Sequence, residues 1–419
     1  MQGAGAEWHR TAIVHVRAYF YDRMSEPMSP ASSAPQGAAQ SAATAPAATG
    51  SSAADAPVLV RRLRGESVDP AAPPSVWFMR QAGRSLPEYR AAREGTGMLE
   101  ACLTPDLAAE ITVQPVRRHR VDAGIFFSDI VVPARIAGLE VEIVPGRGPV
   151  FAHPIRTRAD IDALPPIGDH TEEALEPIRE AVRLTTAELG PTPLIGFCGA
   201  PFTVASYMVE GGPSRDHLRT RALIREDPEA WDRLAGWVAE LSGRFLRAQV
   251  LAGAQAVQLF DSWVGALSAE TYLAHVQHHS AAVLGAVADL PVPRIHFGVG
   301  ASHLLREMHA AGATTMGVDH RIGLDQAIDI LGGDVPVQGN IDPAVLFTGA
   351  EAREAEARTV LARGAAAPGH VVNLGHGVPP DTDPGVLTDL VAFLHEQTPG
   401  DPASTTTTST PDAREADAL

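Results

Sequence analysis

The sequence predicts a single (β/α)8 TIM barrel whose active-site cleft lies at the C-terminal ends of its strands. Eight short apolar runs rich in β-forming residues recur between about residues 76 and 374, and most are followed by a segment of helical periodicity. The runs are almost continuously apolar, as strands buried on both faces of a parallel sheet are. An open doubly wound sheet is the alternative, but the first strand-to-helix turn lacks the GxGxxG phosphate-binding sequence.

The expected strands are residues 76–80, 124–128, 193–198, 256–260, 294–298, 314–318, 335–339 and 370–374. Between them, Thr104-Pro105 and Asp227-Pro228 each place a capping residue directly before a proline, which is typical of a helix start. After Pro228, one helical face collects the apolar residues Trp231, Leu234, Val238, Leu241 and Phe245. The segments 300–313 and 320–333 have room for one helix each, as tight strand–helix repeats require.

The two ends of the chain differ in composition from this repeating part. Residues 25–57 are mostly Ala, Ser and Pro, and residues 398–419 are mostly small and polar. Such segments cannot bury enough apolar surface to offset the entropy of ordering. We therefore expect a disordered N-terminal arm at 1–56, the barrel at 57–397 and a disordered C-terminal tail at 398–419.

Composition excludes several classes of protein. The net charge of −17 on 419 residues argues against nucleic acid as a partner. No run of about 18 or more uncharged apolar residues is present, so no membrane span is expected, and the first residues do not read as a signal peptide. The two cysteines, Cys102 and Cys198, form neither a CxxC motif nor a disulfide framework, which suits a reducing cytoplasm.

The sequence contains no lysine, so all 33 Lys and Arg positions are arginine. A Schiff base to a substrate or to pyridoxal phosphate therefore cannot form, and a Walker A phosphate loop is excluded. The metal-binding patterns HExxH, CxxC and HxH are absent as well. His275, His278 and His279 could place two imidazoles one helical turn apart, although a solvated helix face explains them better. The sequence predicts a site that uses neither a cofactor nor a metal.

Polar residues and glycines follow the expected strands, and in a barrel these positions meet at one face. In chain order they are Arg80 and Arg84, Ser128-Asp129, Tyr207, Asp261-Ser262, Gly298, Asp319-His320, Asn340 and Asp342, and Gly375-His376-Gly377. Apolar walls for the same cavity are expected from Phe126, Phe127, Phe260 and Phe297.

Each of these candidates also has a structural interpretation. Arg80 and Arg84 could form salt bridges along a helix, and Tyr207 stands at a helix start, where a core role is common. Asp129 could cap a turn, but a carboxylate directly after the apolar run 125–127 needs a partner or a ligand. His376 stands between two glycines, which allow a ligand to approach closely.

Six motifs, in this order along the chain, resemble those of uroporphyrinogen decarboxylases: WFMRQAGRSLPEYR (77–90), FFSDI (126–130), GFCGAPFTVASYMVEGG (196–212), QLFDSW (258–263), GNIDP (339–343) and NLGHGV (373–378). The resemblance covers about residues 57–397. It implies a (β/α)8 barrel that acts as a cytoplasmic homodimer in haem and tetrapyrrole biosynthesis. It also implies the reaction: the four acetate side chains of uroporphyrinogen III become methyl groups, giving coproporphyrinogen III, without cofactor or metal.

The resemblance further implies roles for individual residues. Arg80 and Arg84 hold carboxylates of the macrocycle, and Asp129 accepts hydrogen bonds from the pyrrole N–H groups. An arginine, Tyr207 or His376 relays protons, and the sequence does not decide which. The substrate-binding set is Arg80, Gln81, Ala82, Gly83, Arg84, Phe127, Asp129, Tyr207, Phe260, Ser262 and His376. The chain departs from the family at Ser85, where tyrosine is usual, and at Phe202, where tryptophan is usual.

Two other functions are weighed against this one. Corrinoid-dependent methyltransferases of the same superfamily carry a zinc site of His and Cys, whereas neither cysteine here stands at a ligand spacing from a histidine. A tetrapyrrole-binding protein without turnover is disfavoured because Arg80, Asp129, Tyr207 and His376 are all present.

Overall fold

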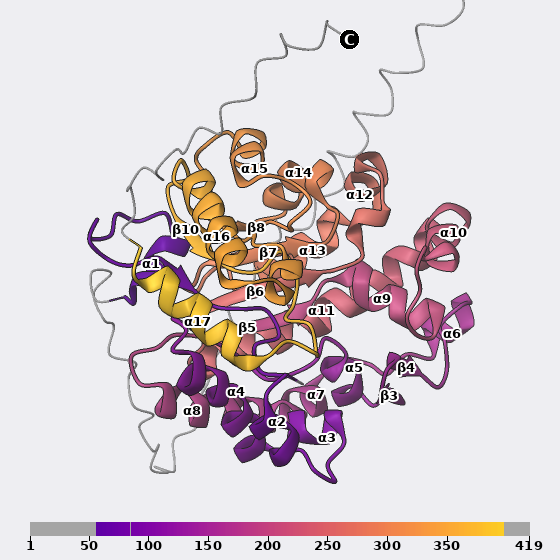
Figure 1. Ribbon diagram of the computed structural model, residues 1–419. Helices are drawn as coiled ribbons and strands as arrows, with labels where there is room; N and C mark the ends of the chain where they lie inside the picture. The colour runs from indigo at the N-terminus through magenta and orange to yellow at the C-terminus, as the bar shows by residue number, and fades with distance from the viewer. Residues whose placement is uncertain (1–55, 84, 398–419) are drawn as a thin grey trace, which may run out of the picture. The chain divides into compact units, whose positions relative to one another are not determined.

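The computed structural model describes residues 56–83 and 85–397. The predictions for Arg84 and for the two terminal segments lie outside these described residues. Its frame is a parallel sheet of eight strands in the order β1-β10-β9-β8-β7-β6-β5-β2, with helices arranged around it (Figure 1). The strands are β1 (Ser75–Val76), β2 (Gly124–Ile125), β5 (Leu194–Gly199), β6 (Ala256–Asp261), β7 (Arg294–Gly298), β8 (Thr315–Gly317), β9 (Val337–Gln338) and β10 (His370–Val372). Each overlaps one of the expected strands, and the predicted (β/α)8 barrel is confirmed.

The first strand is shorter than expected because side chains replace part of the backbone ladder. The N–H of Phe78 donates to Gln81 Oε1 (2.9 Å), and that of Met79 donates to Asn373 Oδ1 (3.0 Å). The pairing of β1 therefore ends at Val76, and the following residues turn toward the face where the strands end.

Strands β1 and β2 stand at the two ends of the sheet order and are joined by individual hydrogen bonds. The Asp122 N–H donates to Val76 O (2.8 Å), and the Asp122 carboxylate accepts from the Val76 N–H (2.7 Å). The amide of Gln81 donates to Ala123 O (2.9 Å). These contacts bring the two end strands together and close the barrel.

The helices that cover the strands are α1 (Val58–Leu63), α2 (Pro87–Ala92), α3 (Met98–Leu103), α4 (Pro105–His119), α5 (Val132–Ile136), α6 (Arg158–Asp162), α7 (Asp169–Ala174), α8 (Glu176–Leu189), α9 (Pro201–Glu210), α10 (Leu218–Glu226), α11 (Pro228–Ala252), α12 (Ala269–His275), α13 (Gln277–Gly285), α14 (Leu305–Ala310), α15 (Leu324–Leu331), α16 (Ala350–Gly364) and α17 (Pro384–His395). Three short 3-10 turns add η2 (Val264–Ala266), η3 (Ser302–Leu304) and η4 (Pro343–Phe347).

Both helix starts expected from an X-Pro pair are confirmed. The Asp227 carboxylate accepts a hydrogen bond from the Ala230 N–H (3.1 Å) and so caps α11. Thr104 precedes α4, but its hydroxyl donates back to Glu100 O (2.9 Å) and does not cap the helix. The expected apolar face of α11 is buried along its length, at Trp231, Leu234, Val238, Leu241 and Phe245.

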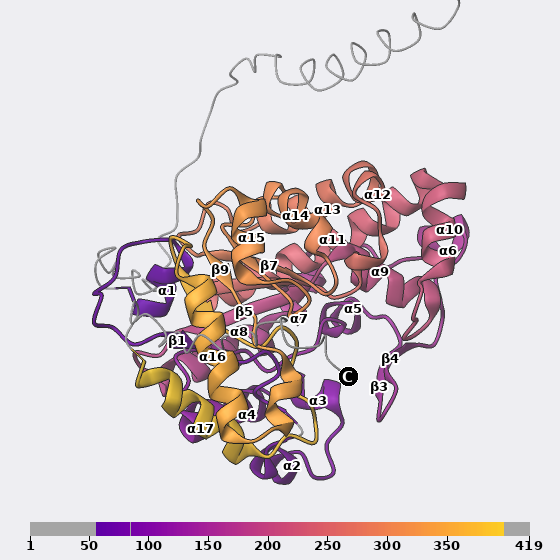
Figure 2. The ribbon, with the colours of Figure 1, turned by 45° about the horizontal axis from the view of Figure 1, so that its top comes forward.

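An antiparallel hairpin, β3 (Val141–Val144) and β4 (Gly148–Phe151), is a feature that the sequence analysis missed. Its turn contains Gly146 (φ 76°) and Gly148 (φ 101°), in the left-handed region that glycine adopts at little cost. The hairpin stands apart from the barrel sheet (Figure 2), and the Phe151 N–H donates to Gly211 O (3.2 Å) just after α9.

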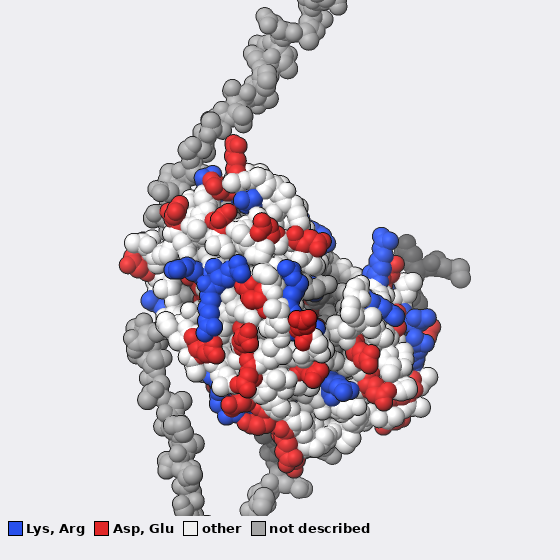
Figure 3. Space-filling model, turned by 60° about the horizontal axis from the view of Figure 1, so that its bottom comes forward, with Lys and Arg blue, Asp and Glu red and all other residues white. Residues whose placement is uncertain are grey.

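Within residues 56–83 and 85–397, no helix combines the length and the apolar character needed to cross a bilayer. On the face shown in Figure 3, acidic and basic side chains are interspersed. An anionic ligand would therefore be held by a local group of arginines and not by the charge of a whole face.

Candidate active site

Arg80, Asp129, Tyr207 and His376 follow four different strands and lie close enough to act on one another electrostatically. Arg80 follows β1, Asp129 follows β2, Tyr207 lies in α9 after β5, and His376 follows β10. The charge of Arg80 influences the pKa of each of the other three residues. The fold thus brings these four candidates to one place at the C-terminal ends of the strands.

Asp129 has a carboxylate in surroundings of low polarity. Burial raises the pKa of Asp129 above its ordinary value, while the Val131 N–H (3.0 Å) and the positive charge of Arg80 act in the opposite direction. A carboxylate with so little solvation is stabilised by cations and by N–H donors. Asp129 is therefore suited to a ligand that brings such groups.

Tyr207 and His376 are both uncharged at neutral pH in this environment. Burial, followed by the negative charge of Asp129, raises the pKa of Tyr207 to about 12. Burial, followed by the charge of Arg80, lowers the pKa of His376. Tyr207 offers a phenolic O–H, and the neutral imidazole offers one donor and one acceptor nitrogen.

Arg80 is exposed, but its backbone is strained and its aliphatic stem packs against one neighbouring residue. Its φ angle is 62°, a region that costs free energy for a residue with a side chain. Its aliphatic stem lies against the backbone of Gly377, where an added Cβ would stand 2.5 Å from Arg80 Cδ and 2.8 Å from Cγ. A glycine at 377 is therefore required to let the arginine pass beside His376.

Gly377→Ala is expected to displace the Arg80 side chain and lower turnover by up to about 100-fold, because misplacing a binding group by an ångström has effects of that size. Steady-state kinetics measures the loss, and thermal melting checks that the fold is retained. Gly285→Ala is the matched control, since an added Cβ there meets nothing within 4 Å. Equal turnover in both variants would show that the contact between Arg80 and Gly377 does not matter.

The residues that follow Arg80 in the first motif differ in burial and in role. Gln81 is fully buried, and its amide bonds the Phe78 N–H and Ala123 O. The Gln81 side chain thus holds the turn that carries Arg80, which is a different task from the expected contact with a ligand. Ala82 and Gly83 are half-buried beside it, and Arg84 lies outside the described residues.

The four expected aromatic walls are unequal in exposure. Phe126, Phe127 and Phe297 are almost fully buried, and Phe127 packs edge-on against Tyr89 with ring centroids 5.7 Å apart. Phe260 is half-buried and packs edge-on against Phe197 and Phe297. Only Phe260 of the four keeps an appreciable open surface.

A cleft of about 440 Å³ opens beside Tyr207, at the C-terminal ends of β6, β7 and β8. Trp263 lines it and stacks on Tyr207 on one side (3.9 Å between ring centroids) and on His217 on the other (4.3 Å). The full lining is Ser214, Arg215, Asp216, His217, Arg221, Ser262, Trp263, Gly265, Ala266, Val299, Gly300 and Arg321. The predicted residue Ser262 and three arginines therefore share one cleft.

Several polar residues at the strand ends support loops and are not presented to the cleft. Asp261 is fully buried, accepts a hydrogen bond from the Thr203 hydroxyl (2.7 Å) and lies 3.7 Å from the buried His296. Asp319 accepts from the Gly300 N–H (2.6 Å) and pairs with the guanidinium of Arg321. Asn340 and Asp342 likewise bond neighbouring backbone groups.

The sequence analysis missed Trp263, His217, Arg93 and the arginines of the cleft. Arg93 donates a hydrogen bond to the Tyr89 hydroxyl (2.5 Å). Burial, followed by the charge of Asp129, raises the pKa of the Cys102 thiol, and the charge of Arg93 acts in the opposite direction. Trp263 directly follows the predicted Ser262, so its position alone was a usable signal. Arg93 lies in the turn after α2 and His217 directly before α10, where no strand end marks them.

Of the two departures from the family pattern, Phe202 lies next to the cleft. It is fully buried and packs edge-on against His217 and Trp231, with ring centroids 6.2 Å and 6.0 Å away. Ser85, directly after residue 84, is buried. Phe202, in place of the usual tryptophan, therefore changes the packing against His217, which lines the cleft.

Comparison with known proteins identifies the family. The model of the family described as uroporphyrinogen decarboxylase (URO-D) matches residues 56–397. A uroporphyrinogen decarboxylase of Arthrobacter sp. (strain FB24) is 60% identical over 324 residues, 77% of this chain and 93% of that protein. One of Leifsonia xyli subsp. xyli (strain CTCB07) is 57% identical over 357 residues, 80% of this chain and 93% of that protein.

Among solved structures, a methyltransferase from Methanosarcina mazei superposes with a TM-score of 0.66 at 18% sequence identity, covering 80% of this chain and 96% of that one. A likeness at this identity reflects the shared barrel alone. The family match, by contrast, spans the whole described barrel and includes every strand end discussed above. The chain belongs to the uroporphyrinogen decarboxylase family.

Proposed function

We propose that this chain removes CO2 from the four acetate side chains of uroporphyrinogen III and releases coproporphyrinogen III. The observation that carries the proposal is the poorly solvated carboxylate of Asp129, which lies within the electrostatic reach of Arg80 and Tyr207, while the same Arg80 also acts on His376. Membership of the family supports the same reaction. Arg80, Arg84, Asp129, Tyr207 and His376 are the proposed catalytic residues.

When the bond to CO2 breaks, its electron pair needs an acceptor, and a protonated pyrrole ring can be that acceptor. A proton added to a ring carbon gives a cationic ring; the acetate C–C bond then breaks, and its electron pair neutralises the ring as CO2 leaves. A second proton completes the methyl group, and the ring carbon gives up the first. Each step thus converts CH2–COO⁻ and one proton into CH3 and CO2.

Asp129 has the charge that this sequence of steps requires. As an ionised carboxylate it would accept the pyrrole N–H bonds and stabilise the cationic ring more strongly than the neutral substrate. Arg80 and Tyr207 act on it electrostatically, His376 lies within reach of Arg80, and these three are the candidates for moving protons. Phe260, which is half-buried, would lie against an apolar face of the macrocycle.

The eight carboxylates of the substrate require several cations, because the chain as a whole is acidic. Arg80 lies beside Asp129, and Arg215, Arg221 and Arg321 line the cleft next to Tyr207. A hydrogen bond between charged groups contributes about 1.5–3 kcal/mol. Arg80 and the three arginines of the cleft would together orient the ring so that one acetate at a time meets Asp129.

The direct test is incubation of the chain with uroporphyrinogen III, followed by separation of the products by their number of carboxyl groups. We expect intermediates with seven, six and five carboxyls and a final product with four. Recovery of the eight-carboxyl substrate alone, from a chain that is folded by circular dichroism, would contradict the proposal.

Dialysis against a strong chelator is expected to leave turnover unchanged, because none of the proposed catalytic groups requires a metal. The rate is measured before dialysis, after dialysis and after zinc is added back. A large loss that zinc restores would instead favour a zinc-dependent methyl transfer.

We propose that residues 57–397 are sufficient for activity. Deleting residues 1–55 and 399–419 is expected to leave the melting temperature and turnover nearly unchanged, because residues 25–55 are mostly Ala, Ser and Pro and residues 399–419 are mostly small and polar. A drop of several degrees in the trimmed chain would show that a terminal segment packs on the barrel. We also propose a cytoplasmic homodimer, which sedimentation analysis of the full chain tests.

A further inference from the structure

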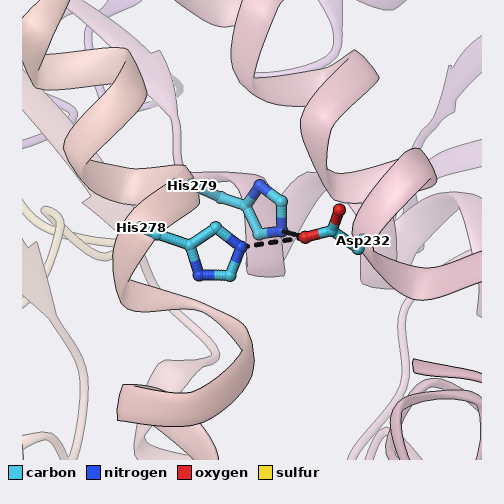
Figure 4. A group of neighbouring side chains, drawn as sticks. All are labelled: Asp232, His278 and His279. Carbon is cyan, nitrogen blue, oxygen red and sulfur yellow. Dashed lines mark hydrogen bonds and ion pairs between the residues drawn. The ribbon is translucent and has the colours of Figure 1, made fainter. Parts of the chain in front are cut away.

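Three side chains that could act as metal ligands meet on the outer helices of the barrel, apart from the residues proposed for catalysis. Asp232 lies in the second turn of α11, and His278 and His279 lie at the start of α13 (Figure 4). Asp232 Oδ1 is 2.9 Å from His278 Nε2 and 3.2 Å from His279 Nε2. All three ligand atoms lie within 4.8 Å of one another.

We propose that Asp232, His278 and His279 form a binding site for a divalent transition metal ion such as Zn²⁺. Two imidazoles and one carboxylate are a donor set that zinc accepts, with its remaining position open to water. Ligand atoms about 2.0–2.1 Å from a tetrahedral ion stand about 3.3 Å apart. The two observed separations, 2.9 and 3.2 Å, differ from that spacing by only a few tenths of an ångström.

The buried member of the trio indicates that the site is built for a ligand. The His279 side chain is only 6% exposed, and its Nε2 faces Asp232 Oδ1 at 3.2 Å without the geometry of a full hydrogen bond. A buried polar atom whose hydrogen bonding is incomplete is costly. A metal ion between the three side chains would satisfy it.

The charges of the trio also favour a cation. Carboxylates nearby are paired with arginine, as Asp227 and Glu229 are with Arg158. Among the described residues, the ion-pair partners of Asp232 are the imidazoles of His278 and His279 alone.

The surrounding packing holds the three ligands in place. The indole N–H of Trp231, next to Asp232, donates to His275 O (2.8 Å) and ties the start of α11 to the end of α12. The His279 ring lies beside Gly236 of α11, where even an added Cβ would stand 3.9 Å from His279 Cε1. Ligands carried by two packed helices are positioned more precisely than ligands carried by loops. His275, the third histidine of the sequence trio, does not join the cluster.

A metal bound here would connect α11 to α13. Because it binds the folded chain and not the unfolded one, it should raise the melting temperature in a concentration-dependent way. None of its ligands lines the cleft or belongs to the proposed catalytic set. The site is therefore independent of the proposed decarboxylation, and turnover should not depend on its occupancy.

The test is titration of the chelator-treated full chain with ZnCl2 in a calorimeter, with melting temperatures recorded at each zinc concentration. His278→Ala and Asp232→Asn remove one exposed ligand each and spare the buried His279. His153→Ala is the matched control, because His153 is also exposed and faces a single carboxylate, Glu140, at 3.5 Å.

We expect one zinc site in the wild-type chain and in His153→Ala. Each ligand variant should bind zinc at least about tenfold more weakly, since even residues that only support a ligand change metal affinity by 10–100-fold. Zinc should raise the melting temperature of the wild type and not that of the ligand variants, with decarboxylation unchanged in all four chains. No zinc binding by the wild type, or equal affinity in the wild type and both ligand variants, would overturn the proposal.

Discussion

Asp129→Asn is expected to lower turnover by about 10²–10³, the typical effect of removing one electrostatic stabiliser from an active site. Asparagine keeps the size of the side chain and can still accept the hydrogen bond from the Val131 N–H. It removes the negative charge that would stabilise the cationic ring. The loss should therefore appear mainly in kcat, because the neutral substrate gains less from that charge than the cation does.

Asp129→Glu separates charge from position. Glutamate keeps the charge but moves it by about one methylene toward the bound ring, so that this variant should bind substrate less well and still turn over faster than Asp129→Asn. Product formation is measured for all three chains, and circular dichroism confirms that each is folded. Wild-type turnover by Asp129→Asn would reduce Asp129 to a residue that caps the turn at Val131.

Arg80→Lys is expected to lower kcat/KM by about 10–100-fold although the charge is conserved. Lysine cannot form the planar two-point contact that a guanidinium makes with a carboxylate. The backbone at Arg80 has a φ of 62°, so the fold accepts strain to place this side chain.

Arg117→Lys is the matched control for that substitution. Arg117 is 65% exposed and pairs with Glu188 on the outside of the barrel, where an ion pair contributes little. Its kinetics should match the wild type. If Arg80→Lys also matched the wild type, a point charge would be sufficient at this position, and the two-point contact would have no role.

The architecture was predictable because each repeat has a local signature. Apolar runs that end in polar residues marked all eight strands, and Asp227-Pro228 and Thr104-Pro105 marked two helix starts. The hairpin β3–β4 was missed because its strands lie outside the repeating pattern. The early end of β1 depends on hydrogen bonds to the side chains of Gln81 and Asn373, and Asn373 is 294 residues away from its partner Met79 in the chain.

The candidate site was predictable in its location and less so in its details. Position after a strand pointed to Arg80, Asp129 and His376, because strand ends converge in a barrel. The direction of a side chain depends on tertiary packing, and for this reason Gln81 and Asp261 turned out to be buried in hydrogen-bonded positions. The cluster of Asp232, His278 and His279 was not predictable for the same reason, because Asp232 is 46 residues away from His278 in the chain and only tertiary packing brings them together.

The central claim is that the macrocycle binds at the C-terminal ends of the strands with Asp129 facing its pyrrole nitrogens. A crystal structure of the chain with coproporphyrinogen III, kept reduced, tests this claim most directly. The account predicts an Asp129 carboxylate oxygen about 2.7–3.2 Å from the pyrrole nitrogens, the range of an N–H···O hydrogen bond, with Arg80 on a propionate. A macrocycle bound elsewhere, or one bound in the cleft with its nitrogens turned away from Asp129, would contradict it.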